Sequence, residues 1–130
     1  MGKVIVVGGG AAGMLASIFA VENGNEVHVL EKNEKLGKKL FITGKGRCNV
    51  TNACDVEELF PAVMSNGKFL YSAFYGFNSQ DMMAFLENAG LRLKVERGNR
   101  VFPESDRSSD VIRTLEKEMK KAGVQIHLYT

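Results

Sequence analysis

Apolar residues in this chain form short runs that are separated by turns rich in glycine and asparagine. Residues 4–7 are a continuous β-branched run, which predicts a parallel strand covered on both faces. After three glycines, residues 11–23 are apolar over most of a helical circumference and predict a well-buried helix. Gly24 can end that helix in the left-handed conformation, and a second short strand is predicted over residues 27–31.

Residues 32–53 break this pattern. They are rich in Lys, Gly and Asn, yet they include the apolar triplet Leu40-Phe41-Ile42. We interpret the segment as a long structured loop with at most one short helical turn. Long loops inside compact domains are often functional, so this segment is a candidate binding region.

The second half of the chain predicts helices, one hairpin and a last strand. Gly98 stands between two apolar stretches and favours a hairpin turn. Val124, Ile126 and Leu128 alternate with polar residues, which predicts a strand with one better-buried face. The predicted elements are a short helix from Asp55 to about Met64 capped by Asp55, a helix over 68–75, a helix over 80–89 capped by Asn78 or Ser79, hairpin strands over 91–96 and 100–102, a helix over 110–122 capped by Ser108 or Ser109, and a strand over 124–128.

This order of elements predicts an α/β fold of the Rossmann-like, doubly wound type. It has a βαβ unit with parallel strands, an inserted excursion of helices and a hairpin, and a chain that stops after the third parallel strand. A complete fold of this type continues with further strands, so we expect a truncated domain. An uncovered sheet edge invites pairing with a second copy, and we therefore also expect self-association.

The glycine run after the first predicted strand fits the dinucleotide-binding pattern G-x-G-x-x-G. Gly8 permits the tight turn, Gly10 lets the backbone approach a pyrophosphate, and Gly13 allows the helix to pack closely on the strand. Glu31 follows Gly13 by 18 residues, where a carboxylate accepts hydrogen bonds from a ribose and repels a 2′-phosphate. The fingerprint does not separate FAD from NAD. The alternative interpretation is a glycine-rich turn without a nucleotide.

Residues 37–52 are the most distinctive stretch of the loop. Gly44 and Gly46 allow close backbone approach, while Arg47 and the lysines offer positive charge. This composition suits an anionic heteroaromatic ligand, and it suits a basic, solvated surface loop about equally well. The stretch is not a P-loop, because Lys45 is followed by glycine where a P-loop has Ser or Thr.

Together, GGGAAG near the N-terminus, TGKGRCNVTN in the loop and the later GNRVFP resemble a bacterial flavoprotein family. Its members are NAD(P)/FAD-dependent oxidoreductases, including aminoacetone-oxidase-like enzymes and a bile-acid enone reductase. The resemblance implies that the FAD pyrophosphate is held by Gly8, Gly10, Ala11, Ala12 and Gly13, and the adenosine ribose by Glu31. It implies that Lys32, Lys38 and Lys39 lie near the cofactor, and that Gly46, Arg47, Cys48 and Asn49 run beside the flavin ring.

Family members are considerably longer, so the resemblance implies that residues 1–130 are the N-terminal portion of an FAD-binding domain. A substrate domain and the segment that closes the FAD site would be absent. We expect a flavin-dependent oxidoreductase that transfers hydride through flavin N5, with FAD as cofactor, NAD(P)H as an electron donor of the intact protein, and no catalysis by these residues alone. The alternatives are an inactive nucleotide-binding fragment and, less favoured, an FAD-dependent tRNA-modifying protein. No catalytic residue is assigned.

Charge and cysteine content restrict the partners. The formal net charge is +2, and no basic stripe interleaved with aromatic residues is present, which predicts a small-molecule substrate with neither nucleic acid nor membrane as partner. Cys48 and Cys54 match no zinc or redox spacing, so we expect no metal and a cytoplasmic location. Cys48 is not an obvious catalytic thiol, although Lys45 and Arg47 are expected to depress its pKa.

Overall fold

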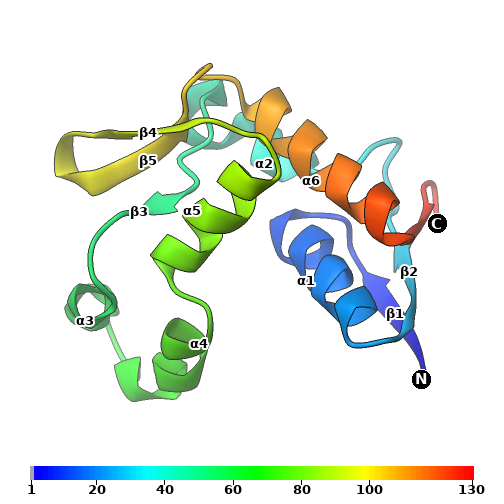
Figure 1. Ribbon diagram of the computed structural model, residues 1–130, viewed down its shortest axis with the longest axis horizontal. Helices are drawn as coiled ribbons and strands as arrows, with labels where there is room; N and C mark the ends of the chain where they lie inside the picture. The colour runs from blue at the N-terminus through cyan, green and yellow to red at the C-terminus, as the bar shows by residue number, and fades with distance from the viewer. Residues whose placement is uncertain (1) are drawn as a thin grey trace.

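A computed structural model describes residues 2–130 of the protein (Figure 1). A parallel sheet lies at one end of the molecule, and the hairpin and short helices of the excursion lie at the other. The elements in chain order are β1 (Lys3–Val7), α1 (Ala11–Glu22), β2 (Glu26–Leu30), α2 (Lys38–Ile42), β3 (Thr51–Asn52), α3 (Val56–Leu59), α4 (Tyr71–Gly76), α5 (Ser79–Asn88), β4 (Leu93–Glu96), β5 (Arg100–Pro103), α6 (Ser108–Ala122) and β6 (Gln125–His127).

The parallel sheet has the strand order β1-β2-β6. Val29 in the central strand pairs with Val6 of β1 and with Ile126 of β6. Helix α1 packs on β1 and β2 and also against α6. The predicted α/β fold with a parallel Rossmann sheet is therefore confirmed.

The core lies between this sheet and helices α1 and α6. Val27 and Val29 of β2 are fully enclosed, together with Met14 and Ile18 of α1. Met119 of α6 is buried in the same cluster. Helix α5 adds Leu86 from the excursion, so one core joins both parts of the chain.

The prediction that the first strand is covered on both faces is wrong for residues 2–130. Val4 and Val6 pack against the core, but Ile5 and Val7 on the other face are 50% and 85% exposed. Helix α1 packs on β1 and β2, and α6, which packs on α1, contributes to the same buried cluster as Val6 and Val29. A continuous apolar run shows that both faces avoid water, but it does not show which residues cover them.

The excursion forms a second, antiparallel sheet of order β3-β5-β4. Strands β4 and β5 make the predicted hairpin, and Gly98 in its turn has φ +78°. The predicted cap of α5 is also present, because Asn78 and Asp81 form a reciprocal capping box at its start. This sheet and α5 hold the loop after α2 in place.

Three local predictions need correction. Ser108 is the first residue of α6 and not its cap; its hydroxyl instead donates to the carbonyl of Phe41 at 2.6 Å. Asp55 precedes α3, but its side chain accepts no capping hydrogen bond. The predicted loop over 32–53 contains α2, a 3₁₀ turn over Thr43–Gly46 and β3, which is more structure than one helical turn. These short elements are stabilised by residues that are distant in the sequence, and a local sequence pattern does not indicate such contacts.

Among residues 2–130, the helices are all too short or too polar to cross a membrane.

Candidate functional site

The fingerprint forms a tight turn at the end of β1. Gly8 has φ +101°, and its N–H donates to the carbonyl of Leu30 at 2.8 Å, which ties the turn to β2. Gly10 is the last residue before α1, with an extended backbone, and its carbonyl accepts the first helical hydrogen bond from Met14. The turn therefore points the start of α1 toward the carboxyl end of the parallel sheet, where α/β proteins bind their ligands.

The glycines of this turn have different steric roles. A Cβ at Gly13 would lie 1.9 Å from the carbonyl oxygen of Gly8, so only glycine lets α1 approach β1 this closely. A Cβ at Gly10 would meet no atom within 4 Å. The protein itself leaves the space beside Gly10 free, which is what close approach of a phosphate requires.

The first turn of α1 is suited to an anion. Within Ala11–Glu22, which the structure describes in full, no side chain caps the N-terminus and the first turn has no acidic residue. Ala11 and Ala12 are exposed there. Free backbone N–H groups and the positive end of the helix dipole favour a pyrophosphate at this position.

Glu31 follows β2 and lies against the fingerprint. Its Oε1 accepts from the N–H of Gly9 at 2.8 Å, and its Oε2 accepts from the N–H of Asn33 at 2.9 Å. The hydrogen bonds from Asn33 and Gly9 hold the pKa of the carboxyl below its usual value, although partial burial opposes this. Each oxygen keeps a second lone pair, so the carboxylate remains able to accept from ribose hydroxyls.

The lysines of the predicted site are exposed and lie beyond Glu31. Lys38, the first residue of α2, pairs with Glu34 in the preceding bend at 3.0 Å, while Lys32 and Lys39 are exposed. These three residues are near the fingerprint in the chain, but in residues 2–130 none of them has a contact that fixes it toward a ligand. Their role near the cofactor stays a prediction.

The loop of Gly46, Arg47, Cys48 and Asn49 has an unusual backbone. Gly46 has φ +87°, and Cys48 has φ +62°, which is uncommon for a residue with a side chain. The N–H of Cys48 donates to the carbonyl of Thr43 at 3.0 Å, and the Asn49 amide donates to the carbonyl of Val101 at 3.1 Å. The loop is thus fixed both to itself and to β5.

Cys48 is fully buried. Burial raises the pKa of its thiol, opposed only by a hydrogen bond with Thr43, so the expected depression by neighbouring cations is wrong. A protonated, enclosed thiol is a poor nucleophile. This agrees with the view that Cys48 has no direct chemical role.

The two sequence motifs meet in one cleft. An apolar cavity of about 230 Å³ is lined by Ala11 and Ala12 of the fingerprint helix and by Cys48 of the loop. Leu40 and Val50 complete the wall on the loop side. Ala12 and Cys48, which are 36 positions apart in the chain, therefore line one cavity, in which a helix end suited to an anion lies beside an apolar wall.

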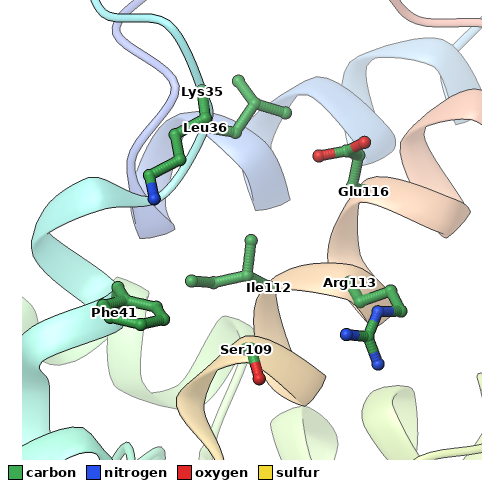
Figure 2. Close-up of a pocket in the computed structure, with 7 residues that line it drawn as sticks. All are labelled: Lys35, Leu36, Phe41, Ser109, Ile112, Arg113 and Glu116. Carbon is green, nitrogen blue, oxygen red and sulfur yellow. The ribbon is translucent and has the colours of Figure 1, made fainter.

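A second groove of about 290 Å³ lies between α2 and α6, as Figure 2 shows. Phe41 and Ile112 form its apolar floor, and the Lys35 ammonium lies 5.3 Å from the centre of the Phe41 ring. Leu36 lines this groove, and its Cδ2 atom would lie 2.4 Å from a Cβ added to Gly9. The groove thus borders the fingerprint turn but shares none of its glycines.

Sequence reasoning missed the partners that hold the site residues. Gly9 and Asn33 fix Glu31 through backbone groups, which carry no sequence signature. Arg47 makes ion pairs with Glu96 and Asp106, which lie 49 and 59 residues further along the chain. The GNRVFP motif pointed to this region, but its role was not assigned.

Comparison with known proteins agrees with this geometry. The family model described as the HI0933-like protein Rossmann domain matches residues 2–130. The chain is 33% identical to the 3-dehydro-bile acid delta(4,6)-reductase of Clostridium scindens, covering 98% of this chain and 31% of the relative. It is 29% identical to the ribosomal RNA dihydrouridine synthase of Escherichia coli, covering 95% and 30%. The chain therefore spans about a third of the length of these curated relatives.

Solved structures show the same fold. The open conformation of a flavocytochrome c3 fumarate reductase is 27% identical with a TM-score of 0.64, covering 98% of this chain and 26% of that one. Thermovibrio ammonificans THI4 has the same TM-score at 14% identity, covering 97% and 38%, and it supports the fold alone.

Proposed function

This chain belongs to the HI0933-like Rossmann-domain family, and from that premise we propose that it binds FAD as part of a flavin-dependent oxidoreductase. The observation that carries the proposal is the single cleft formed by Ala11, Ala12 and Cys48. One side of it offers the free N–H groups of a helix start, which suit a pyrophosphate. The other side offers an apolar wall, which suits the aromatic part of a flavin.

Each residue group then has a separate binding task. The turn of Gly8, Gly10 and Gly13 would hold the pyrophosphate, because it combines open space with donors. Glu31 would hold the adenosine ribose, since its carboxylate is ionised and positioned by two backbone N–H groups. The loop of Gly46 to Asn49 would cover the flavin and shield it from water.

Three relatives suggest the class of reaction. Their names describe a delta(4,6)-reductase of a 3-dehydro-bile acid, a synthase of dihydrouridine and a reductase of fumarate. In each, a carbon–carbon double bond next to a carbonyl or carboxylate is the group that gains two hydrogens. We propose the same class of substrate for the intact protein: hydride adds to the carbon distal to the carbonyl, and a proton adds to the neighbouring carbon.

When bound and reduced, the flavin supplies that hydride from its N5 atom, while the protein contributes orientation and exclusion of water. NAD(P)H as the source of the electrons stays a prediction. The charge balance favours a small molecule as the double-bond substrate, and a uridine in RNA is the alternative.

The first experiment is an absorbance spectrum of the purified full-length protein with and without added FAD. We expect the bands of oxidised flavin at stoichiometric FAD. A colourless protein that gains no bound flavin on incubation would overturn the proposal. Glu31→Ala should weaken FAD binding in a titration, whereas Glu26→Ala, at the opposite end of β2, should not.

A second experiment separates the substrate classes. The intact protein, loaded with FAD and reduced by dithionite, is mixed anaerobically with a conjugated steroid dienone or with an unmodified ribosomal RNA transcript. Flavin reoxidation with loss of the dienone absorbance supports a small-molecule reductase, and dihydrouridine in the RNA supports the alternative. Reoxidation by neither compound would remove the proposal of conjugated double-bond reduction.

A further inference from the structure

Arg47 belongs to a cluster of four charged side chains that packs on one aromatic ring. Its Nε donates to Oδ1 of Asp106 at 2.8 Å, and its Nη2 pairs with Oε2 of Glu96. Lys94 bridges the same two carboxylates, at 2.6 Å to Asp106 and 3.3 Å to Glu96. The guanidinium carbon lies 3.9 Å from the centre of the Phe102 ring.

The cluster joins segments that are far apart in the chain. Arg47 comes from the loop after α2, Lys94 and Glu96 from β4, and Asp106 from the turn before α6. All four side chains are roughly one-third exposed, between 29% and 41%, so water screens the individual pairs. Two carboxylates bind the guanidinium in its plane, and the Phe102 ring packs on its face. This arrangement restricts the orientation of the guanidinium more than a single surface ion pair would.

The segment that this arrangement holds is the one with the unfavourable backbone. Lys45 and Cys48, on either side of Arg47, both have left-handed backbones, at φ +56° and +62°. Such conformations persist only where surrounding contacts hold them. Arg47 adds to the hydrogen bonds of Cys48 and Asn49, because its main chain lies in this loop and its side chain is anchored on β4 and on the turn before α6.

We propose that Glu96, Asp106 and Lys94 are positioning residues that act through Arg47 to hold the loop of Gly46 to Asn49 against the cofactor. The guanidinium, occupied on Phe102 and two carboxylates, serves as an anchor of this loop and not as a contact to the flavin ring. The part that concerns the cofactor rests on the proposed function; the anchoring of the loop does not.

The first test measures the loop without any cofactor. Cys48 is fully buried and reports on loop opening, and Cys54→Ser removes the other thiol. In this background, Asp106→Asn should increase the native-state rate of Cys48 modification by a thiol reagent by about tenfold, because the local opening becomes more populated. Glu116→Gln, which removes an ion pair with Lys120 on α6, is the matched control and should leave the rate unchanged.

Thermal unfolding of each variant separates local from global opening. The anchoring role requires faster Cys48 modification in Asp106→Asn and Glu96→Gln at temperatures where both remain folded. Equal rates in these variants and in Glu116→Gln would overturn it. Asp106→Glu, which keeps a carboxylate, should restore much of the protection.

The second test uses the FAD-loaded protein. At saturating FAD, Asp106→Asn should change the shape of the bound-flavin absorption bands and lower the affinity for FAD, and Asp106→Glu should restore both. A residue that only stabilised the fold would leave the saturated spectrum unaltered, and that result would overturn positioning toward the cofactor. If the parent protein binds no FAD, the proposed function fails, while the thiol experiment still decides whether the cluster anchors the loop.

Discussion

Replacing Gly13 by alanine is the sharpest test of how the fingerprint works. In most helix interiors this change stabilises a protein by about 1 kcal/mol, because alanine has the better helix propensity. Here the new Cβ would lie 1.9 Å from the carbonyl oxygen of Gly8, where real Cβ contacts are essentially never below 3.0 Å. The two backbones must therefore separate by at least 1.1 Å.

The atom in the way is a backbone oxygen, so no side-chain rotation relieves the clash. Overpacking of this kind costs about 3 kcal/mol, at the upper end of the usual range, and it exceeds the gain in helix propensity. We expect a net loss of about 2 kcal/mol, which corresponds to a fall in Tm of roughly 8 °C for a domain of this size. Urea and thermal unfolding, followed by circular dichroism, measure both quantities.

Gly10→Ala is the matched control. Gly10 has φ −86°, which any residue adopts, and its Cβ would meet open space, so stability should change by less than about 1 kcal/mol. FAD binding should nevertheless be lost, because the methyl group occupies the space that we assign to a phosphate. A Gly13→Ala protein as stable as the parent would refute the argument that α1 is packed directly on the β1 turn.

Three further predictions concern stability. The pKa of Glu31 is lowered in the folded protein, so the Glu31 carboxylate stabilises the fold fully above the ordinary glutamate pKa. This stabilisation is lost as the pH falls through the lowered pKa of the folded protein. The urea midpoint measured from pH 7 to pH 3 should therefore fall less steeply in Glu31→Gln than in the parent protein. Ser108→Ala removes the 2.6 Å hydrogen bond to the Phe41 carbonyl and should cost about 1 kcal/mol in urea unfolding, with Ser109→Ala as the control. Asn78→Ala should cost about 1 kcal/mol by removing the cap of α5, and Asn78→Ser should recover most of that loss; equal stability of all three proteins would contradict a role for the cap.

The elements with strong local signals were predictable from the sequence. The strand, glycine turn and helix over residues 3–22 follow from an apolar run, three glycines and helical periodicity, and the structure has them in that order. Gly98 likewise marked the hairpin turn, and Asn78 marked the start of α5. In each case the residues that determine the element lie within the element itself.

The rest depends on contacts between distant residues. Ser108 looks like a helix cap in the sequence, yet its hydroxyl bonds to Phe41, 67 residues earlier in the chain. The same is true of Arg47, whose positive charge predicted a ligand contact, while its side chain is bound to Glu96 and Asp106. A charged residue in a loop indicates that its side chain has a partner of opposite charge. Whether that partner is a ligand or another side chain depends on the fold.

The pairing of β2 with β6 has a consequence for the timing of folding during synthesis. Val29 pairs with Ile126, so 97 more residues must be synthesised after Val29 before the central strand gains its second neighbour. Contacts of such long sequence separation form late, whereas the hairpin of β4 and β5 requires only its own residues. Glu31 lies at this joint, with its N–H bound to the carbonyl of His127 and its carbonyl accepting from Thr130. The site that we propose for the nucleotide is therefore expected to be completed last, and in a nascent chain that ends before β6 the backbone of Glu31 would lack both of these hydrogen bonds.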